Sequence, residues 1–175
     1  CMACVEKCHR NAITIKDDLK YYNALVDTKK CVDCGLCTKV CPRENDNDMS
    51  KPKWWYQGWA DSEIREYASS GGAASAIIRT FIKNGGYVAS CLFDSGKFVF
   101  EVTNEMAVAR KFAGSKYVKS NPEKIYGKIQ SLLKANQKVL FIGLPCQVAA
   151  VNQFIKDKTN LVTADLICHG TPSPY

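Results

Sequence analysis

Short apolar runs alternate with polar turns near the start of the chain, and their pattern changes after residue 45. Residues 12–15 and 22–26 are predicted to form two short strands around a polar turn, which is typical of a β-hairpin. The stretch after residue 45 is first polar and then aromatic, and proline interrupts it, so it is predicted to be a linker. We place a small unit at residues 1–45, the linker at 46–62 and a larger unit at 63–175.

Turn and capping residues divide the larger unit into helical and extended segments. Helices are predicted at residues 62–67, 73–83, 122–135 and 145–156. Strands are predicted at residues 87–93, 98–102, 139–144 and 161–167. For the helix at 122–135, Asn121 is the expected cap and Pro122 the first helical residue. This alternation predicts an α/β domain with a mostly parallel sheet.

The cysteines of the small unit form two copies of one motif, 33 residues apart. The members are Cys1, Cys4 and Cys8 in the first copy and Cys34, Cys37 and Cys41 in the second. Cys31 has no counterpart, because that residue would precede residue 1, and the chain is therefore interpreted as a fragment.

Residues 31–42 fit the C-x2-C-x2-C-x3-C-P run of bacterial ferredoxins at every position. In such a run, three close thiolates bind one 4Fe-4S cluster and the fourth binds the other cluster. The motif predicts an α+β ferredoxin-like module for two clusters. The expected ligands are Cys8, Cys31, Cys34 and Cys37 for one cluster, and Cys1, Cys4 and Cys41 for a second cluster that is incomplete in this fragment.

Zinc and disulfides are the alternatives for these cysteines. Structural zinc sites use two separated pairs, whereas this motif is a triplet followed by a single cysteine. Tight spacing without a secretory leader disfavours disulfides and indicates a reducing compartment. No apolar run is long enough for a transmembrane segment, so a cytoplasmic protein is expected. His9 stands where proline usually follows the fourth cysteine, and an exposed loop histidine is a simpler interpretation than a proton carrier.

The formal net charge is +7, but bound clusters would reduce this excess because each carries negative charge. The remaining basic character suits anionic cofactors. Nucleic-acid binding would need a basic stripe interleaved with aromatic side chains. Only residues 51–59, KPKWWYQGW, suggest one, and aromatic cover for a domain junction is the simpler interpretation. No nucleic-acid partner is expected.

Two polar motifs of the larger unit could contact a ligand. The Ser-Ser-Gly-Gly run at residues 69–72 opens a predicted helix, where free backbone N–H groups commonly bind anions. A plain serine N-cap explains the same run. The run at residues 114–117 places a hydroxyl, a cation and an aromatic ring together, although a solvated turn has the same composition.

Two cysteines of the larger unit follow predicted strands. Cys146 comes after the strand at 139–144, and Cys168 precedes His169 after the strand at 161–167. Open α/β sheets bind ligands at these carboxyl ends. A helix start at Cys146 would also favour its thiolate. Buried, inert thiols are the alternative for both, and Cys91 in mid-strand is assigned to the core.

Four segments in order resemble the beta subunit family of coenzyme F-420 hydrogenases and dehydrogenases. They are REYASSGG at 65–72, GSKYVKS at 114–120, FIGLPCQV at 141–148 and DLICHGTPS at 165–173. Ala68 departs from an expected serine, and the further C-terminal cysteines of the family are absent.

The resemblance implies an iron-sulfur flavoprotein oxidoreductase that binds FAD and passes electrons between its clusters and a deazaflavin-type or other two-electron substrate. Its expected partner is an electron-donor protein, an electron-acceptor protein or a deazaflavin-type cofactor. The chain is also a candidate subunit of a larger complex. The implied flavin-binding residues are Ser69, Ser70, Gly71, Gly72, Ser115, Lys116 and Tyr117. Cys146, Cys168 and His169 are catalytic candidates, and the two cysteines are either ligands of a further cluster or part of the flavin pocket wall. The alternatives are a non-catalytic electron-relay subunit and a structural iron-sulfur protein.

Overall fold

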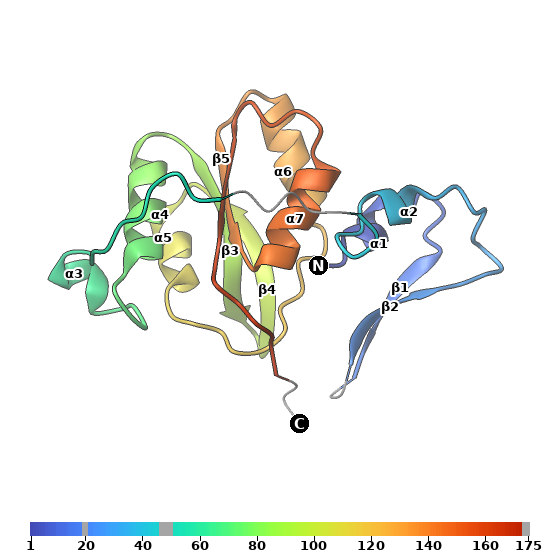
Figure 1. Cartoon of the computed structure of the whole chain (residues 1–175), viewed down its shortest axis with the longest axis horizontal. Coiled ribbons are helices and arrows are strands. Elements are labelled where there is room, and N and C mark those ends of the chain that lie inside the picture. The colour runs from blue at the N-terminus through green and yellow to red at the C-terminus, as the bar shows by residue number, and fades with distance from the viewer. Residues whose placement is uncertain (19–20, 46–50, 173–175) are drawn as a thin grey trace.

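A computed structural model describes residues 1–18, 21–45 and 51–172, and its elements form two groups (Figure 1). The first group contains α1 (Ala3–Lys7), β1 (Ile13–Asp17), β2 (Tyr22–Val26) and α2 (Leu36–Lys39). The second contains α3 (Ser62–Arg65), α4 (Ala73–Lys83), β3 (Tyr87–Asp94), β4 (Lys97–Thr103), α5 (Met106–Ala109), the 3-10 helix η1 (Arg110–Phe112), α6 (Ile125–Lys134), β5 (Val139–Gly143), α7 (Pro145–Phe154) and β6 (Leu161–Asp165).

The repeat of cysteines in the sequence is also a repeat of local structure. Met2 has a φ of 56° and precedes α1, while Gly35 has a φ of 68° and precedes α2. Each copy thus makes a left-handed turn and then begins a short helix. Glycine adopts this turn at no steric cost, whereas methionine does not. Between the copies, β1 and β2 pair antiparallel as the predicted hairpin.

The larger unit is an α/β domain built on a four-stranded mixed sheet in the order β4-β3-β5-β6. β3 pairs parallel with β5, and β5 pairs parallel with β6, while β4 is antiparallel to β3. The prediction of a mostly parallel sheet is therefore confirmed. Ser95 and Gly96 make the tight turn between β3 and β4 with φ of 48° and 82°, as a two-residue hairpin requires.

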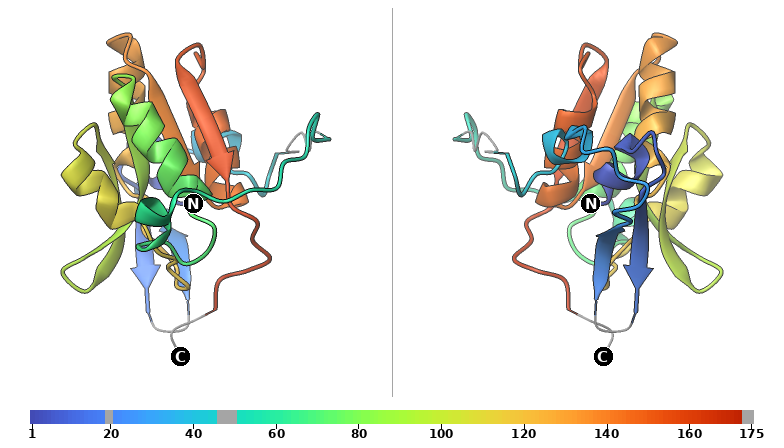
Figure 2. Two further views of the ribbon diagram at one scale, coloured as in Figure 1. Left: turned by 90° about the vertical axis from the view of Figure 1, so that its left-hand side faces the viewer. Right: turned by 90° about the vertical axis from the view of Figure 1, so that its right-hand side faces the viewer.

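Side chains alternate between the two faces of the sheet, and each face has its own core. The helices lie on both sides of the sheet (Figure 2). Leu140 and Ile142 of β5 pack towards α4, α5 and η1. Val139 and Phe141 point to the opposite face, among residues of α6 and α7. All five residues of β5 are buried, which accounts for its continuous apolar sequence.

The predicted start of the helix at 122–135 is wrong. α6 begins at Ile125, and Lys124 before it has a φ of 67°. Asn121 continues the sheet instead, because its N–H donates to the Phe98 oxygen at 2.8 Å and its oxygen accepts the Phe100 N–H at 3.2 Å. Pairing with β4 thus overrides the local capping signal. The structure also contains α5 and η1, which the sequence pattern did not predict.

Helix α6 is capped by a residue of the first group. The Glu6 carboxylate of α1 accepts the Gly127 N–H at 2.8 Å and the Tyr126 N–H at 3.3 Å. These N–H groups lie in the first helical turn and have no partner within the helix. A carboxylate at this position also favours the positive end of the helix dipole. Burial raises the pKa of Glu6, and the hydrogen bonds from the Gly127 and Tyr126 amides oppose that shift.

Apolar contacts continue this junction. Ala3 of α1 and Val40 after α2 are buried in the same core cluster as Tyr126 and Phe154. The Tyr126 hydroxyl donates a hydrogen bond to the Cys1 carbonyl. The first cysteine loop is therefore fixed against α6 and α7. Among the described residues, no helix is both long and apolar enough to cross a bilayer.

Glu6→Ala should lower stability by about 1–2 kcal/mol, because two N–H groups of α6 lose their acceptor. In a domain of this size this corresponds to a fall in melting temperature of about 2–8 °C. Glu6→Gln should lose less, since one acceptor oxygen remains. Glu66→Ala, at an exposed glutamate after α3, is the control. Equal melting temperatures for Glu6→Ala and the control, measured by circular dichroism, would contradict this cap.

Candidate functional site

The thiols of the two cysteine copies approach one another across α1 and α2. Burial raises the pKa of the Cys4 thiol, and the nearby Cys41 raises it further, with a smaller contribution from Cys37. The Cys8 sulfur accepts the Ala12 N–H at 3.3 Å, a contact of the kind that tunes cluster potentials. Across residues 1–18, 21–45 and 51–172, no three His, Cys, Asp or Glu side chains are arranged around a metal-ion position. The donor set, which consists of thiols alone, suits iron-sulfur chemistry.

The two predicted ligand sets differ in their surroundings. Cys31 and Cys34 are exposed, and Val32 between them is 58% exposed. Cys1 instead packs against the core beneath α6 and α7. The loop with Cys31 and Cys34 therefore faces solvent, while Cys1 and Val40 pack against the α/β domain.

Cys146 lies at the junction of the two groups, in the first turn of α7. Cys146 is close enough to the Cys1 nitrogen to interact with it electrostatically, as are Cys4 and Cys41. Burial raises the pKa of Tyr126, and Glu6, Cys146 and Cys4 add to this rise. The side chain of Tyr126 thus lies near both Cys146 and the first cysteine copy. The sequence identified Cys146 as a candidate but gave no sign that it lies near Cys4.

The Ser-Ser-Gly-Gly run forms a tight turn before α4. Gly72 is the N-cap, with a φ of 76°, and among the described residues no side chain caps this helix. The alternative of a serine N-cap is therefore wrong. The Ser70 hydroxyl instead accepts the N–H of the adjacent Gly71 at 2.6 Å. The first turn of α4 keeps backbone N–H groups without a capping side chain.

One hydrogen bond joins the two polar motifs of the larger unit. The Ser69 hydroxyl accepts the Ser115 N–H at 2.7 Å across 46 residues. Tyr117 extends into solvent and is 74% exposed in the structure, although its sequence neighbours are held in place. The runs at 69–72 and 114–117 are thus neighbours in space.

Lys116 is held by backbone oxygens rather than directed into solvent. Its ammonium donates to the carbonyls of Phe112 at 2.7 Å, Ala113 at 2.8 Å and Lys111 at 3.3 Å. These carbonyls end η1, where a cation is favourable. Burial lowers the pKa of Lys116, and nearby Cys91 opposes this shift. In this conformation Lys116 orders the loop at 114–117.

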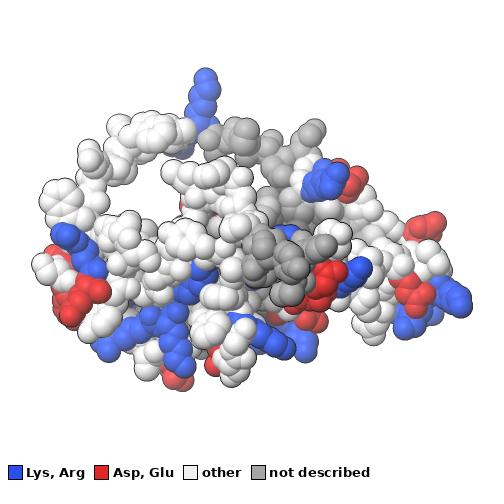
Figure 3. Space-filling view, turned by 90° about the horizontal axis from the view of Figure 1, so that it is seen from below, with Lys and Arg blue, Asp and Glu red and all other residues white. Residues whose placement is uncertain are grey.

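The aromatic linker runs beside the Ser-Ser-Gly-Gly turn. The Ala60 N–H donates to the Gly71 carbonyl at 2.8 Å, and a Cβ on Gly71 would lie 3.4 Å from the Gly58 oxygen. The rings of this linker are exposed by at least 73%: Trp54, Trp55, Tyr56 and Trp59. The interpretation that they cover a domain junction is therefore wrong within the described chain. In one space-filling view, basic and acidic residues lie interspersed without a continuous basic stripe (Figure 3).

The remaining cysteines follow or lie within the sheet. After β6, the Leu166 N–H donates to the Gly143 carbonyl at 2.9 Å, which extends the pairing with β5 beyond the strand. Cys168 follows, and its sulfur accepts the Gly170 N–H at 3.4 Å, while His169 is exposed. Burial raises the pKa of Cys91 within β3, and the Ser120 hydroxyl and Lys116 oppose this shift.

Comparisons with known proteins bear on both ends of the chain. Residues 1–45 match the family described as 4Fe-4S dicluster domain, and residues 136–175 match the family that describes the C terminus of the coenzyme F-420 hydrogenase/dehydrogenase beta subunit. The predicted family resemblance is confirmed. The iron-sulfur part of the predicted cofactor set is supported by the first match, which covers all seven cysteines of the small unit.

Two further matches extend over the middle of the chain. An uncharacterized protein of Methanocaldococcus jannaschii is 27% identical over 141 residues, covering 75% of this chain and 39% of the relative. A chain of the F-420-reducing nickel-iron hydrogenase complex from Methanosarcina barkeri aligns with a TM-score of 0.53 and 21% identity, covering 63% of this chain and 42% of that one. The similarity to the hydrogenase chain shows a shared fold. The chain spans about two fifths of the length of each protein.

Ser69→Ala should loosen the loop at 114–117, because the Ser115 N–H loses its acceptor. A loss of about 1 kcal/mol corresponds to roughly fivefold faster amide exchange there. Hydrogen exchange followed by mass spectrometry measures this rate on peptides covering the loop. Ser70→Ala, which removes only a bond to the adjacent residue, is the matched control. Unchanged exchange in Ser69→Ala would show that the bond does not hold the two motifs together.

Proposed function

We propose that this chain is the electron-transfer core of an iron-sulfur flavoprotein oxidoreductase. Two 4Fe-4S clusters would carry single electrons, and FAD would convert these into two-electron steps with a deazaflavin-type or other two-electron substrate. The observation that carries the proposal is the position of the first cysteine copy, which is docked on the domain containing the flavin-type motifs. An oxidoreductase needs such a junction, because electrons must pass from one cofactor-binding unit to the other.

The two ligand sets are proposed to act in sequence. Cys31 and Cys34 are exposed and would present their cluster to an external redox protein. Cys1 packs against the core with α6 and α7, Cys4 lies near Cys41, and these three cysteines would hold the inner cluster. Tyr126 fixes the Cys1 main chain at this junction through its hydroxyl hydrogen bond. Cys146 is near the inner set, so it would form part of the path into the α/β domain.

The flavin site is proposed at the start of α4. The uncapped N–H groups after Gly72 would bind a phosphate of FAD, since helix N-termini favour anions. Ser69 holds the loop at 114–117 beside this turn, which would bring Tyr117 towards the cofactor. Lys116 would support the site by ordering that loop, with its ammonium on backbone carbonyls. The roles of Cys168 and His169 remain predictions, as cluster ligand, pocket wall or catalytic group.

A non-catalytic relay subunit is the second candidate function, and the exposed outer cysteines favour it equally. Catalytic activity separates the two. Turnover with a dye acceptor and a reduced deazaflavin or nicotinamide supports the enzyme, whereas stable clusters without flavin binding or turnover support the relay.

Anaerobic reconstitution with iron and sulfide should give a brown protein with broad visible absorption. Cys34→Ala should lose roughly half or more of the bound iron, because Cys34 belongs to the complete ligand set. Cys91→Ala is the matched control, since Cys91 lies in β3 outside both sets. Iron and acid-labile sulfide analysis measures the outcome. A colourless protein that retains zinc, or equal iron in both variants, would refute the cluster assignment.

FAD should bind the reconstituted protein and be released on denaturation. Tyr117→Ala should weaken binding about tenfold, because one exposed aromatic contact of about 1.4 kcal/mol is lost. Tyr21→Ala removes an exposed tyrosine from the small unit and should leave the affinity unchanged. Flavin fluorescence during titration measures both. Absence of flavin binding in the wild-type protein would exclude the flavoprotein proposal.

A further inference from the structure

We propose that a groove between the small unit and the α/β domain binds a phosphate group, either inorganic phosphate or the terminal phosphate of a nucleotide. The groove is a cavity of about 240 Å³ at the ends of α1, α6 and α7. The residues that carry its chemistry are Lys7, Gln130, Lys134, Phe154, Lys156 and Asp157. This site does not depend on the proposed function, because it lies at the C-terminal end of α6 rather than beside α4.

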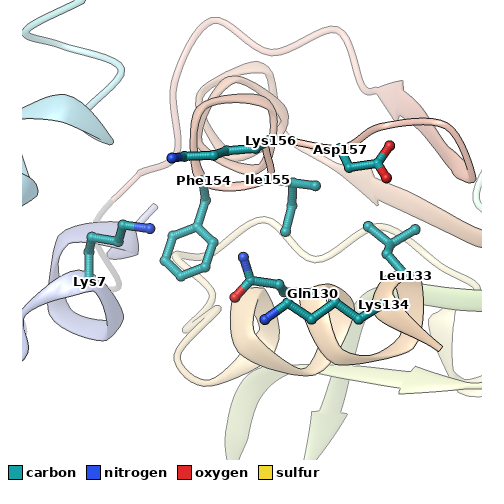
Figure 4. A pocket seen from close by; sticks show the side chains of 8 residues that line it. All are labelled: Lys7, Gln130, Leu133, Lys134, Phe154, Ile155, Lys156 and Asp157. Atoms are coloured by element: carbon teal, nitrogen blue, oxygen red, sulfur yellow. The ribbon is translucent and has the colours of Figure 1, made fainter.

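The polar groups of the groove converge on one place. The ammonium groups of Lys7, Lys134 and Lys156 and the amide of Gln130 end around the ring of Phe154 (Figure 4). The carboxylate of Asp157 points away from them. It already accepts the N–H of Thr159 at 3.0 Å and its hydroxyl at 2.7 Å.

The three lysines are available for an anion. Within the described ranges, the lysines and arginines found in ion pairs are Lys16, Lys30, Arg79 and Lys128, and none of these lines the groove. The Lys7 ammonium lies 4.5 Å from the centroid of the Phe154 ring. A cation over an aromatic face is weakly held compared with an ion pair, so Lys7 keeps its donors for a ligand.

Helix dipoles do not account for three lysines here. Lys7 and Lys134 are the last residues of α1 and α6, and Lys156 follows the end of α7. Each helix C-terminus carries at most about half a negative charge, and a short helix carries less. Three ammonium groups therefore exceed what the three helix ends neutralise, and a net positive potential remains.

The floor of the groove strengthens this potential. Phe154 is 5% exposed and Ile155 is 3% exposed, so the groove has a floor of buried apolar side chains, over which the Lys7 ammonium lies. Charges interact more strongly beside such a surface than in open water. A phosphate group offers two negative charges and several acceptor oxygens, which match three ammonium groups and one amide donor. The cavity volume exceeds that of a phosphate, which leaves room for an organic substituent.

A ligand in this groove would connect the two units. Lys7 belongs to the small unit, whereas Lys134 and Lys156 belong to the α/β domain. A phosphate that contacts all three would add a second bridge beside the cap that Glu6 makes on α6. Bound ligand would therefore hold the inner cysteine copy more firmly against α7.

Isothermal titration calorimetry on the anaerobically reconstituted protein tests the site, with inorganic phosphate, adenosine 5′-monophosphate and adenosine as probes. Phosphate and the monophosphate should bind and adenosine should not. Lys134→Gln and Lys156→Gln should each weaken binding about tenfold. Lys83→Gln is the matched control, because Lys83 also ends a helix, α4, but lies outside the groove.

The two sources of phosphate are distinguished by affinity. Tighter binding of the monophosphate identifies a nucleotide-type ligand, and equal affinities identify inorganic phosphate as sufficient. Absence of heat with both phosphate compounds would overturn the proposal, as would binding that is equal in Lys134→Gln and Lys83→Gln. Adenosine binding that survives loss of the lysines would likewise exclude phosphate as the recognised group.

Discussion

The arrangement of the two units depends on a carboxylate that caps a helix from outside its own domain. Helix α6 begins after Lys124, and the Lys124 side chain makes no capping hydrogen bond, so the first N–H groups of the helix need an external acceptor. Glu6 supplies it from 120 residues earlier in the chain. Gly127 eases the approach, because a Cβ at that position would lie 3.3 Å from the Glu6 oxygen and would press on the carboxylate. One glutamate therefore orients α1 on α6, and with it the first cysteine loop.

The position of Tyr126 follows from that cap. Its amide is bound by Glu6, and its ring is buried beside Phe154, with centroids 5.3 Å apart. The hydroxyl at the other end of the ring reaches the Cys1 carbonyl. The same residue thus contacts the small unit, the helix layer and the surroundings of Cys146. A short connection of this kind would suit the proposed electron transfer, because the distance between the two proposed redox sites would then vary little.

Local signals predicted the parts of the fold that local interactions determine. The bounds of α4 and the tight turn at Ser95 and Gly96 follow from the sequence, because glycine and asparagine residues mark the ends of the helix and the position of the turn. The family resemblance was found from motifs that retain their order. The start of α6 could not be predicted, because Asn121 pairs with β4 instead of capping the helix. The Ser69 contact with Ser115 and the cap by Glu6 join residues far apart in sequence, and no residue type at those positions indicates its partner.

The left-handed turn before α1 shows how the two cysteine copies differ. Gly35 occupies this turn in the second copy, where it costs nothing, but Met2 occupies it in the first copy. A left-handed methionine costs about 1–2 kcal/mol, and burial of its side chain to 7% exposure returns about as much. The two copies of the motif are therefore not equivalent in their packing. Met2 and Ala3 are buried where the module meets the α/β domain, whereas Cys31 and Cys34 are exposed, so the repeated module has one packed side and one open side.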